Sequence, residues 1–155
     1  MNNWFECKVK YEKTMESGLQ KKVTEPYLVD ALSFTEAEAR IIEEISPFMS
    51  GEFSIPNIRR ANIHELFTNE TGDRWYKAKV NFVTLDEKSG AEKKVASYAL
   101  IQASDFPEAL KNLLEGMKGT LADYEIASIT ETALMDIFPY APKEEKTEIE
   151  KVLES

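Results

Sequence analysis

Hydrophobic and polar residues alternate along WFECKVKY, the stretch from Trp4 to Tyr11. Four apolar side chains fall on one side of an extended chain: Phe5, Cys7, Val9 and Tyr11. The intervening side chains, Glu6, Lys8 and Lys10, fall on the other side. Alternation with a period of two residues is typical of a strand with one buried face. The pattern therefore predicts a half-buried β-strand at the start of the chain.

The same pattern returns later as WYKAKVNF, from Trp75 to Phe82. At an offset of 71 residues, five pairs are identical or similar: Trp4/Trp75, Phe5/Tyr76, Lys8/Lys79, Val9/Val80 and Tyr11/Phe82. From Gly18 the offset becomes 72, and nine of twenty positions are identical: Gly18/Gly90, Lys21/Lys93, Lys22/Lys94, Val23/Val95, Leu28/Leu100, Ala31/Ala103, Phe34/Phe106, Glu36/Glu108 and Ala37/Ala109. Residues 53–67 then match residues 124–138 at an offset of 71. The sequence therefore predicts two repeats, 1–71 and 72–138.

Each repeat is expected to form a β-β-α-β unit. A glycine turn, at Gly18 or Gly90, leads into a second strand at about 21–31 or 92–103. Helices follow, and Ser33 and Asp105 stand where a side chain caps the first turn. The third strands, 53–67 and 124–138, are longer than typical strands, so we expect a bend or bulge, favoured in the first repeat by Pro56.

This element order predicts an α+β fold: a duplicated β-β-α-β unit with pseudo-twofold symmetry, and a mainly antiparallel sheet with helices packed on one face. A three-stranded half leaves an edge exposed, so the two repeats could share one continuous sheet, although separate sheets fit the pattern too. We expect residues 1–138 to form one domain. The charged C-terminal tail, 139–155, is expected to be either a frayed end or a short helix carrying Ile149, Val152 and Leu153.

Charge and cysteine content narrow the possible settings. The 155 residues carry a net charge of −9, and an acidic protein repels phosphate backbones over long range. The single cysteine, Cys7, excludes an intrachain disulfide and suits a reducing compartment. The N-terminus lacks the pattern of a signal peptide, and no apolar run has the length of a membrane span. We therefore expect a cytoplasmic protein that does not interact with membranes.

The polar face of the repeated strand is the first candidate binding surface. It would place together Trp4, Lys8, Lys10, Trp75, Lys77 and Lys79. Aromatic rings and ammonium groups on an exposed sheet can hold single-stranded nucleic acid by stacking on bases and pairing with phosphates. The alternative is that both tryptophans pack in the interior and the lysines only protect solvent-facing strands. The acidic net charge favours this alternative.

The second candidate is the segment where the repeats differ. Arg59, Arg60 and the only histidine, His64, have no counterparts in the second repeat. Arginine is the common ligand for carboxylates and phosphates, so these residues could mark a small-ligand site or an active site at the junction of the repeats. The alternative is that the arginines form ordinary surface ion pairs with glutamates.

The residue inventory argues against most familiar catalytic sites. The sequence has no metal-ligand spacing of Cys and His, no glycine-rich phosphate loop and no nucleophile-elbow or HExxH pattern. Cys7 lies on the apolar face of its strand, which favours a small buried side chain over a nucleophile. We therefore expect no metal, no cofactor and no catalytic residue, and regard an enzyme as the less favoured class.

Three segments of the chain together resemble a known family: 4–41, 73–94 and 123–140. The resemblance is to an uncharacterised domain-of-unknown-function family of Bacteroides-type gut bacteria and their phages, and it extends to the charged tail. It implies a small intracellular domain and assigns no binding or catalytic residue. The phage connection implies a role in nucleic-acid metabolism only by analogy.

These observations favour a non-enzymatic binding or protein-interaction module. The acidic surface and the exposed strand edges point to another protein, or a second copy of the chain, as the partner. Two alternatives stay open: a single-stranded nucleic-acid-binding accessory protein, and a small-ligand binder or enzyme at the repeat junction.

Overall fold

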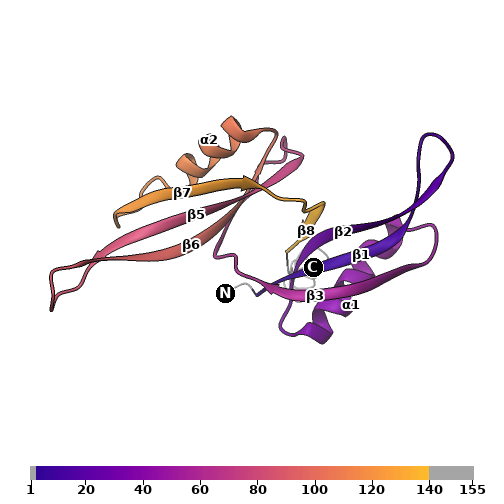
Figure 1. Ribbon diagram of the computed structural model, residues 1–155, viewed down its shortest axis with the longest axis horizontal. Coiled ribbons are helices and arrows are strands. Elements are labelled where there is room, and N and C mark those ends of the chain that lie inside the picture. The colour runs from indigo at the N-terminus through magenta and orange to yellow at the C-terminus, as the bar shows by residue number, and fades with distance from the viewer. Residues whose placement is uncertain (1–2, 140–155) are drawn as a thin grey trace, which may run out of the picture.

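The computed structural model describes residues 3–139, which form eight strands, two α-helices and one 3-10 turn (Figure 1). In chain order the elements are β1 (Trp4–Thr14), β2 (Gln20–Asp30), α1 (Phe34–Ile45), the 3-10 turn η1 (Ser46–Phe48), β3 (Phe53–Ala61), β4 (Glu65–Phe67), β5 (Arg74–Leu85), β6 (Glu92–Ala103), α2 (Phe106–Gly116), β7 (Tyr124–Glu131) and β8 (Asp136–Phe138). Nearly all of the predicted C-terminal tail, including its possible helix at 149–153, lies outside the described residues.

The strands form two four-stranded sheets. The first sheet, which we call sheet A, has the order β3-β1-β2-β8, and the second, sheet B, has the order β4-β6-β5-β7. The long strands are antiparallel in both sheets, so the predicted α+β class with mainly antiparallel pairing is confirmed. One continuous sheet is not formed, because each three-stranded group covers an edge with a short extra strand instead of joining the other group.

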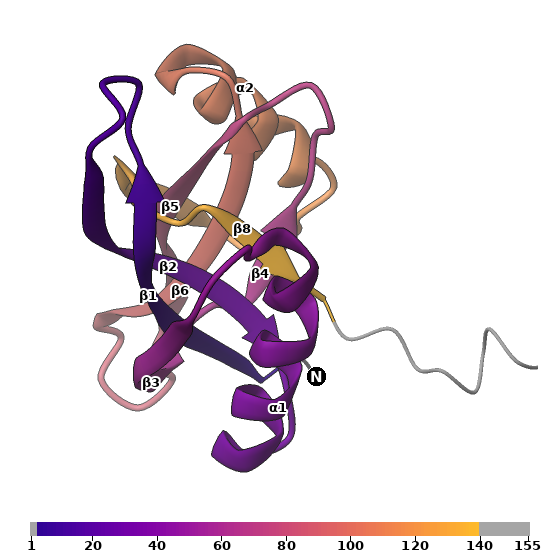
Figure 2. The same cartoon turned by 90° about the vertical axis from the view of Figure 1, so that its right-hand side faces the viewer.

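Each helix covers one face of its own sheet, and the two helices lie on opposite outer sides of the molecule (Figures 1 and 2). The predicted caps are confirmed. The Ser33 Oγ atom accepts the Glu36 amide at 3.1 Å, and the Asp105 carboxylate accepts the Glu108 amide at 2.9 Å. The caps satisfy amides that the first turn of a helix leaves unpaired.

Beneath each helix lies a separate apolar core. In sheet A, the core includes Phe5, Cys7, Val9, Val29 and Ile41. In sheet B, it includes Tyr76, Ala78, Val80, Ile101 and Leu113. The strand alternation seen in the sequence thus buries one face of β1 and β5 against a helix, as expected for amphipathic strands.

The expected bulges are present in both third strands. Opposite β1, the register shifts between Lys8 and Lys10, where β3 contains Pro56. Opposite β5, it shifts between Lys79 and Val80, where β7 contains Ala127. Because the shift also occurs without a proline, Pro56 is compatible with the bulge but is not its cause.

The prediction of a single long third strand is wrong. β3 ends at Ala61, and the following Ile63 side chain is 8% exposed in an apolar cluster between the sheets. The amide of His64 then donates to the Tyr98 carbonyl at 2.8 Å, which starts a new pairing with the opposite sheet. Because Ile63 is buried between the sheets and His64 pairs with Tyr98, the chain leaves sheet A after β3 and joins sheet B.

Consequently, each half of the chain gives its last strand to the sheet of the other half. β4, from the N-terminal half (residues 3–71), pairs in parallel with β6, and Leu66 lies opposite Leu100. β8, from the C-terminal half (residues 72–139), pairs in parallel with β2, and Ile137 lies opposite Leu28. The short strands therefore tie the two halves together by backbone hydrogen bonds.

A third apolar cluster fills the junction between the sheets. It lies on the sheet faces that the helices leave uncovered, and its buried members are Trp4, Leu28, Ile63, Trp75, Leu100 and Ile137. From this junction the β1–β2 and β5–β6 hairpins extend toward opposite ends of the molecule (Figure 1). Away from the junction, the helix-free face of each sheet is therefore exposed to solvent.

Candidate functional site

Both tryptophans of the first candidate surface are buried. Trp4 is 3% exposed and Trp75 is 4% exposed, and both belong to the junction cluster. Base stacking requires an accessible ring face. The candidate arrangement of indole rings beside lysines on an open surface is therefore not formed, because the rings pack in the contact between the sheets, as the favoured alternative predicts.

The lysines of this surface lie farther along the helix-free faces. Lys8 and Lys10 on β1 are exposed, whereas Lys77 and Lys79 on β5 are half-buried. The Lys77 ammonium lies 4.8 Å from the centre of the Tyr98 ring, in cation-π geometry. Among the described residues, Lys8, Lys10 and Lys79 form no ion pair. These lysines are thus the part of the predicted surface that stays accessible.

Arg59 and Arg60 point to opposite faces of β3 and do not form one site. Arg59 forms an ion pair with Glu6, with 2.6 Å between its Nη2 atom and the carboxylate. The guanidinium of Arg60 lies over the rings of Phe5 and Phe34, at 5.1 and 5.5 Å from their centres. Each arginine already has a partner within the protein, as the alternative of surface interactions predicts for Arg59.

His64 has a structural role between the halves. Its Nδ1 atom accepts the amide of Tyr98 at 3.0 Å, and the two rings are stacked with centres 6.2 Å apart. At the corresponding place in sheet A, the amide of Met135 donates to the carbonyl of Pro26 at 2.9 Å. Because Pro26 has no amide hydrogen, no side-chain acceptor is needed there. This explains why a histidine stands in only one half.

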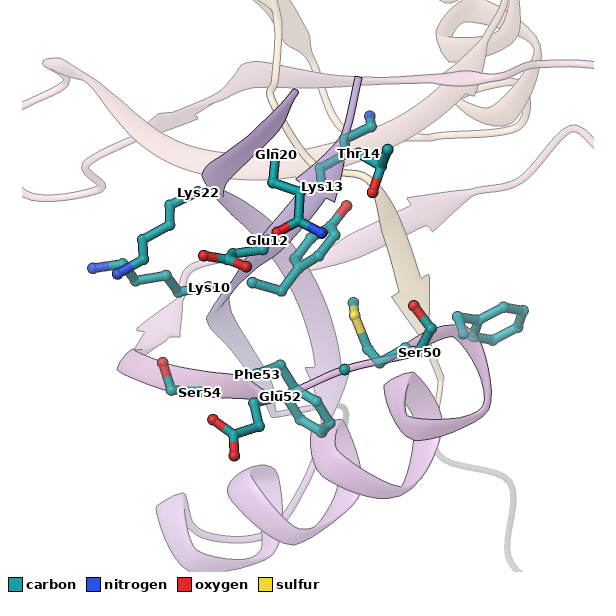
Figure 3. A pocket seen from close by; sticks show the side chains of 14 residues that line it. Lys10, Glu12, Lys13, Thr14, Gln20, Lys22, Ser50, Glu52, Phe53 and Ser54 are labelled. Carbon is teal, nitrogen blue, oxygen red and sulfur yellow. The ribbon is translucent and has the colours of Figure 1, made fainter. Parts of the chain in front are cut away.

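A hollow of about 920 Å³ at the far end of sheet A was not predicted from the sequence (Figure 3). It lies between the ends of β1 and β2 and the loop that joins η1 to β3. The apolar residues that line it are Tyr11, Phe48, Met49 and Phe53. The charged residues are Lys10, Glu12, Lys13, Lys22 and Glu52. A second hollow, of about 460 Å³, lies between β4 and α2. Neither is lined by Arg59, Arg60 or His64.

Two ionisable groups on β1, Tyr11 and Cys7, have raised pKa values. The hydroxyl of Tyr11 donates to the Glu25 carboxylate at 2.5 Å, and this hydrogen bond is the main cause that raises the pKa of Tyr11 to about 12. Burial of the thiol raises the pKa of Cys7 to about 12. A thiol with such a pKa is a poor nucleophile at neutral pH. This agrees with the expected role of Cys7 as a buried apolar side chain.

Within residues 3–139, no group of three His, Cys, Asp or Glu side chains is placed to hold a metal ion. No helix in this range is long and apolar enough to cross a membrane. Among the described residues, the accessible features are the helix-free lysine faces, the two hollows and the outer edges of β3 and β7.

Comparison with known proteins gives a family but no activity. The sequence model of a family described as "Domain of unknown function (DUF4494)" matches residues 3–140. No curated protein and no solved structure matches the chain. The match spans nearly the whole chain, including both halves and all eight strands. The chain therefore belongs to the DUF4494 family, a domain of unknown function.

Proposed function

We propose that the protein is a non-enzymatic interaction module that binds another protein. The observation that carries this proposal is the state of the outer strand edges. β3 ends sheet A with nine residues and β7 ends sheet B with eight, and neither has a neighbour on its outer side among the described residues. An unpaired edge is a template on which an extended segment of another chain can add a strand.

The two edges are not equally open. Pro56 interrupts β3, and a proline at an edge discourages further pairing. β7 contains no proline, and three of its exposed side chains, Ala127, Ser128 and Thr130, are small. Its other exposed side chains, Glu125 and Glu131, form ion pairs with Lys94 and Arg74 within the sheet. The β7 edge therefore carries the stronger expectation of pairing with a partner, including a second copy of the chain.

Light scattering after size exclusion tests the self-association part of this proposal. We expect the average mass to rise with protein concentration, and Thr130→Lys to reduce this rise because a lysine at an edge hinders pairing. Thr120→Lys is the matched control, because it makes the same change at an exposed residue of the same half outside the strands. A monomer at every concentration removes self-association and leaves a different protein as the partner.

Single-stranded nucleic acid is the second candidate partner, and the observation that favours it is that Lys8, Lys10 and Lys79 form no ion pair within residues 3–139. Buried indoles and a net charge of −9 weigh against it. Fluorescence anisotropy of a labelled oligothymidine at low salt is the test, because buried tryptophans are poor reporters of surface binding. Binding that disappears in the Lys8→Glu, Lys79→Glu double variant would establish this candidate, whereas no binding would remove it.

The proposal includes the origin of the fold and its setting. We infer that the halves are two copies of one unit, related by a pseudo-twofold axis within one domain. Matching strand orders, matching bulges and the reciprocal pairing of β4 and β8 support this inference. A cytoplasmic location is supported by the lone cysteine, and a bacterial or phage origin rests only on the sequence resemblance.

A further inference from the structure

The hollow at the end of β1 exists because backbone pairing between the first and third strands of a half extends one hydrogen bond farther in sheet B than in sheet A. In sheet B, the amide of Val83 donates to the Asp123 carbonyl at 2.9 Å, which extends the pairing beyond the start of β7. Their counterparts in sheet A are Glu12 and Glu52, and no hydrogen bond joins these two residues. The loop before β3 therefore diverges from β1, whereas the loop before β7 stays beside β5.

This divergence leaves a short open edge on β1. Glu12 and Thr14 belong to β1, but β3 pairs with it only as far as Tyr11, opposite Phe53. In an antiparallel ladder, the amide and the carbonyl of one residue point to the same side, and the side alternates along the strand. Glu12 therefore directs both groups away from β2, as Val83 does in sheet B, and Thr14 follows two residues later. These groups face the hollow.

The floor of the hollow is apolar. Tyr11, Met49 and Phe53 are partly buried and pack against the core beneath α1. Phe48 stands beside them and is 77% exposed. Figure 3 shows open space between the part of β1 that carries Glu12 and Lys13 and the loop that carries Ser50. A groove with an apolar floor next to an open strand edge is the combination that binds an extended peptide, with main-chain bonds for affinity and a pocket for one side chain.

The charge around the hollow indicates the kind of peptide. Its lining contains three lysines and two glutamates, so it is net positive by one charge in a chain with a net charge of −9. Lys10 and Lys22 extend to the same side of the hollow (Figure 3), and neither forms an ion pair among the described residues. An acidic residue in the peptide would lie close to these ammonium groups.

We propose that an extended segment of a partner protein binds in this hollow. The segment adds a short strand along Glu12–Thr14, places an apolar side chain over Tyr11, Met49 and Phe53, and directs an acidic side chain to Lys10 and Lys22. This site deepens the proposed function and rests on it, because it adds to the outer edges of β3 and β7 a third edge, at the end of β1, and describes how a partner segment binds there.

The test uses a library of random displayed peptides with the full chain as bait. We expect the selected peptides to share an apolar or aromatic residue flanked by acidic residues. Met49→Glu should weaken binding of a selected peptide at least about tenfold, because it places a negative charge on the apolar floor. Thr120→Glu is the matched control, since Thr120 occupies the corresponding place in the C-terminal half and is exposed. It should leave binding unchanged.

Glu12→Pro is a second variant that leaves the floor intact. It removes an amide that points to the hollow, and proline is tolerated at such an edge position. Reduced peptide binding, with an unchanged circular dichroism spectrum, supports strand addition at β1. This variant keeps the test informative if Met49→Glu fails to fold.

The outcomes separate the site from the general function. Selected peptides that bind all three variants and the wild type equally would overturn the site and leave a protein-binding function. A library that yields no binder would overturn both. Competition by a synthetic peptide of residues 140–155 or by oligothymidine would replace the partner protein with, respectively, the chain's own end or nucleic acid, and either result would overturn the proposal.

Discussion

The two halves of the molecule have corresponding residues in the buried junction between the sheets, and they differ in the loops at the outer ends of the sheets. The junction cluster receives corresponding residues from both, such as Trp4 with Trp75 and Leu28 with Leu100. The loops before β3 and β7 have the same length, yet one leaves a hollow and the other continues a ladder. In the junction, each half packs against the other, so the size and polarity of its side chains are constrained. The outer loops are not part of the junction cluster and lack this constraint.

A similar lesson comes from the pair His64 and Tyr98. In sheet B, the β6 amide at Tyr98 needs an acceptor, and the His64 ring provides it. In sheet A, the corresponding residue is Pro26, which has no amide hydrogen, and Met135 faces it. The difference between the halves at this place therefore has one physical cause, which is that a backbone amide needs an acceptor. Sheet B supplies the acceptor with His64, and sheet A removes the amide hydrogen with Pro26.

The largest expected effect concerns the buried leucines of the junction. Leu28→Ala and Leu100→Ala should each lower the free energy of unfolding by about 2–5 kcal/mol, because each removes a side chain that is 2% or 0% exposed and leaves a cavity. Urea unfolding followed by circular dichroism measures both. Similar costs would support the equivalence of the halves. A large loss at one site with little at the other would break it.

The second expected effect contrasts the ends of the two helices. A Cβ atom at Gly116 would lie 2.5 Å from the Phe67 ring, which β4 brings against α2. Gly116→Ala should therefore destabilise the protein by about 1–3 kcal/mol, although alanine favours helices. Glu44 occupies the corresponding place on α1, where its 41% exposed side chain lies 3.6 Å from the Arg40 guanidinium, and should tolerate alanine within about 0.5 kcal/mol. Thermal unfolding of the two variants measures this difference.

The third expected effect concerns whether His64 contributes to stability only by accepting the hydrogen bond of the Tyr98 amide. His64→Met should cost about 1 kcal/mol in the wild-type background, and much less in a Tyr98→Pro background, where no amide requires an acceptor. A double-mutant cycle from urea unfolding gives the coupling directly. Equal costs in both backgrounds would show that His64 stabilises the halves through contacts other than its hydrogen bond and ring stacking with Tyr98.

Tyr11 and Phe82 provide a pH-dependent comparison. The hydrogen bond to Glu25 holds the pKa of Tyr11 at about 12, above the ordinary tyrosine value of about 10. Because the folded pKa is raised, this group contributes stability that is present below pH 10 and is lost as the pH rises toward 12. Burial also raises the pKa of Tyr27, so spectrophotometric titration should show more than one late-ionising tyrosine, and Tyr11→Phe should reduce the size of the late step. A late step of unchanged size in this variant would show that Tyr11 does not contribute to it.

The smallest expected effect is on the reactivity of the Cys7 thiol. The counterpart of Cys7 in the C-terminal half is Ala78. Both are fully buried beneath a helix. Because burial raises the pKa of the thiol to about 12, iodoacetamide should modify it far more slowly in the native protein than in urea. Mass spectrometry over time follows the reaction. Rapid modification of the folded protein would show that the strand opens readily.

The local features of the fold could be predicted from the sequence because they depend on neighbouring residues. Alternation from Phe5 to Tyr11, the capping side chains Ser33 and Asp105, and the bulge near Pro56 are local signals, and the structure contains all of them. The pairing of β4 with β6 could not be predicted, because three residues such as Glu65–Phe67 carry no periodic signal and pair with a strand more than thirty residues away.

The candidate sites were harder to predict for the same reason. Trp4 and Lys8 lie on the same face of β1. The sequence does not indicate that sheet B covers Trp4 and leaves Lys8 exposed to solvent. The hollow arises where Glu52 fails to pair with Glu12, and neither residue type signals this. Only the comparison with Asp123 and Val83 in the other half makes the gap visible.

The reciprocal strands also set an order of events during synthesis. Sheet A is complete only when residues 136–138 reach β2, and these are among the last described residues of the chain. While the chain grows on the ribosome, the outer side of β2 stays uncovered and open to unintended pairing. The N-terminal half thus reaches its final form only after nearly all of the C-terminal half has been made.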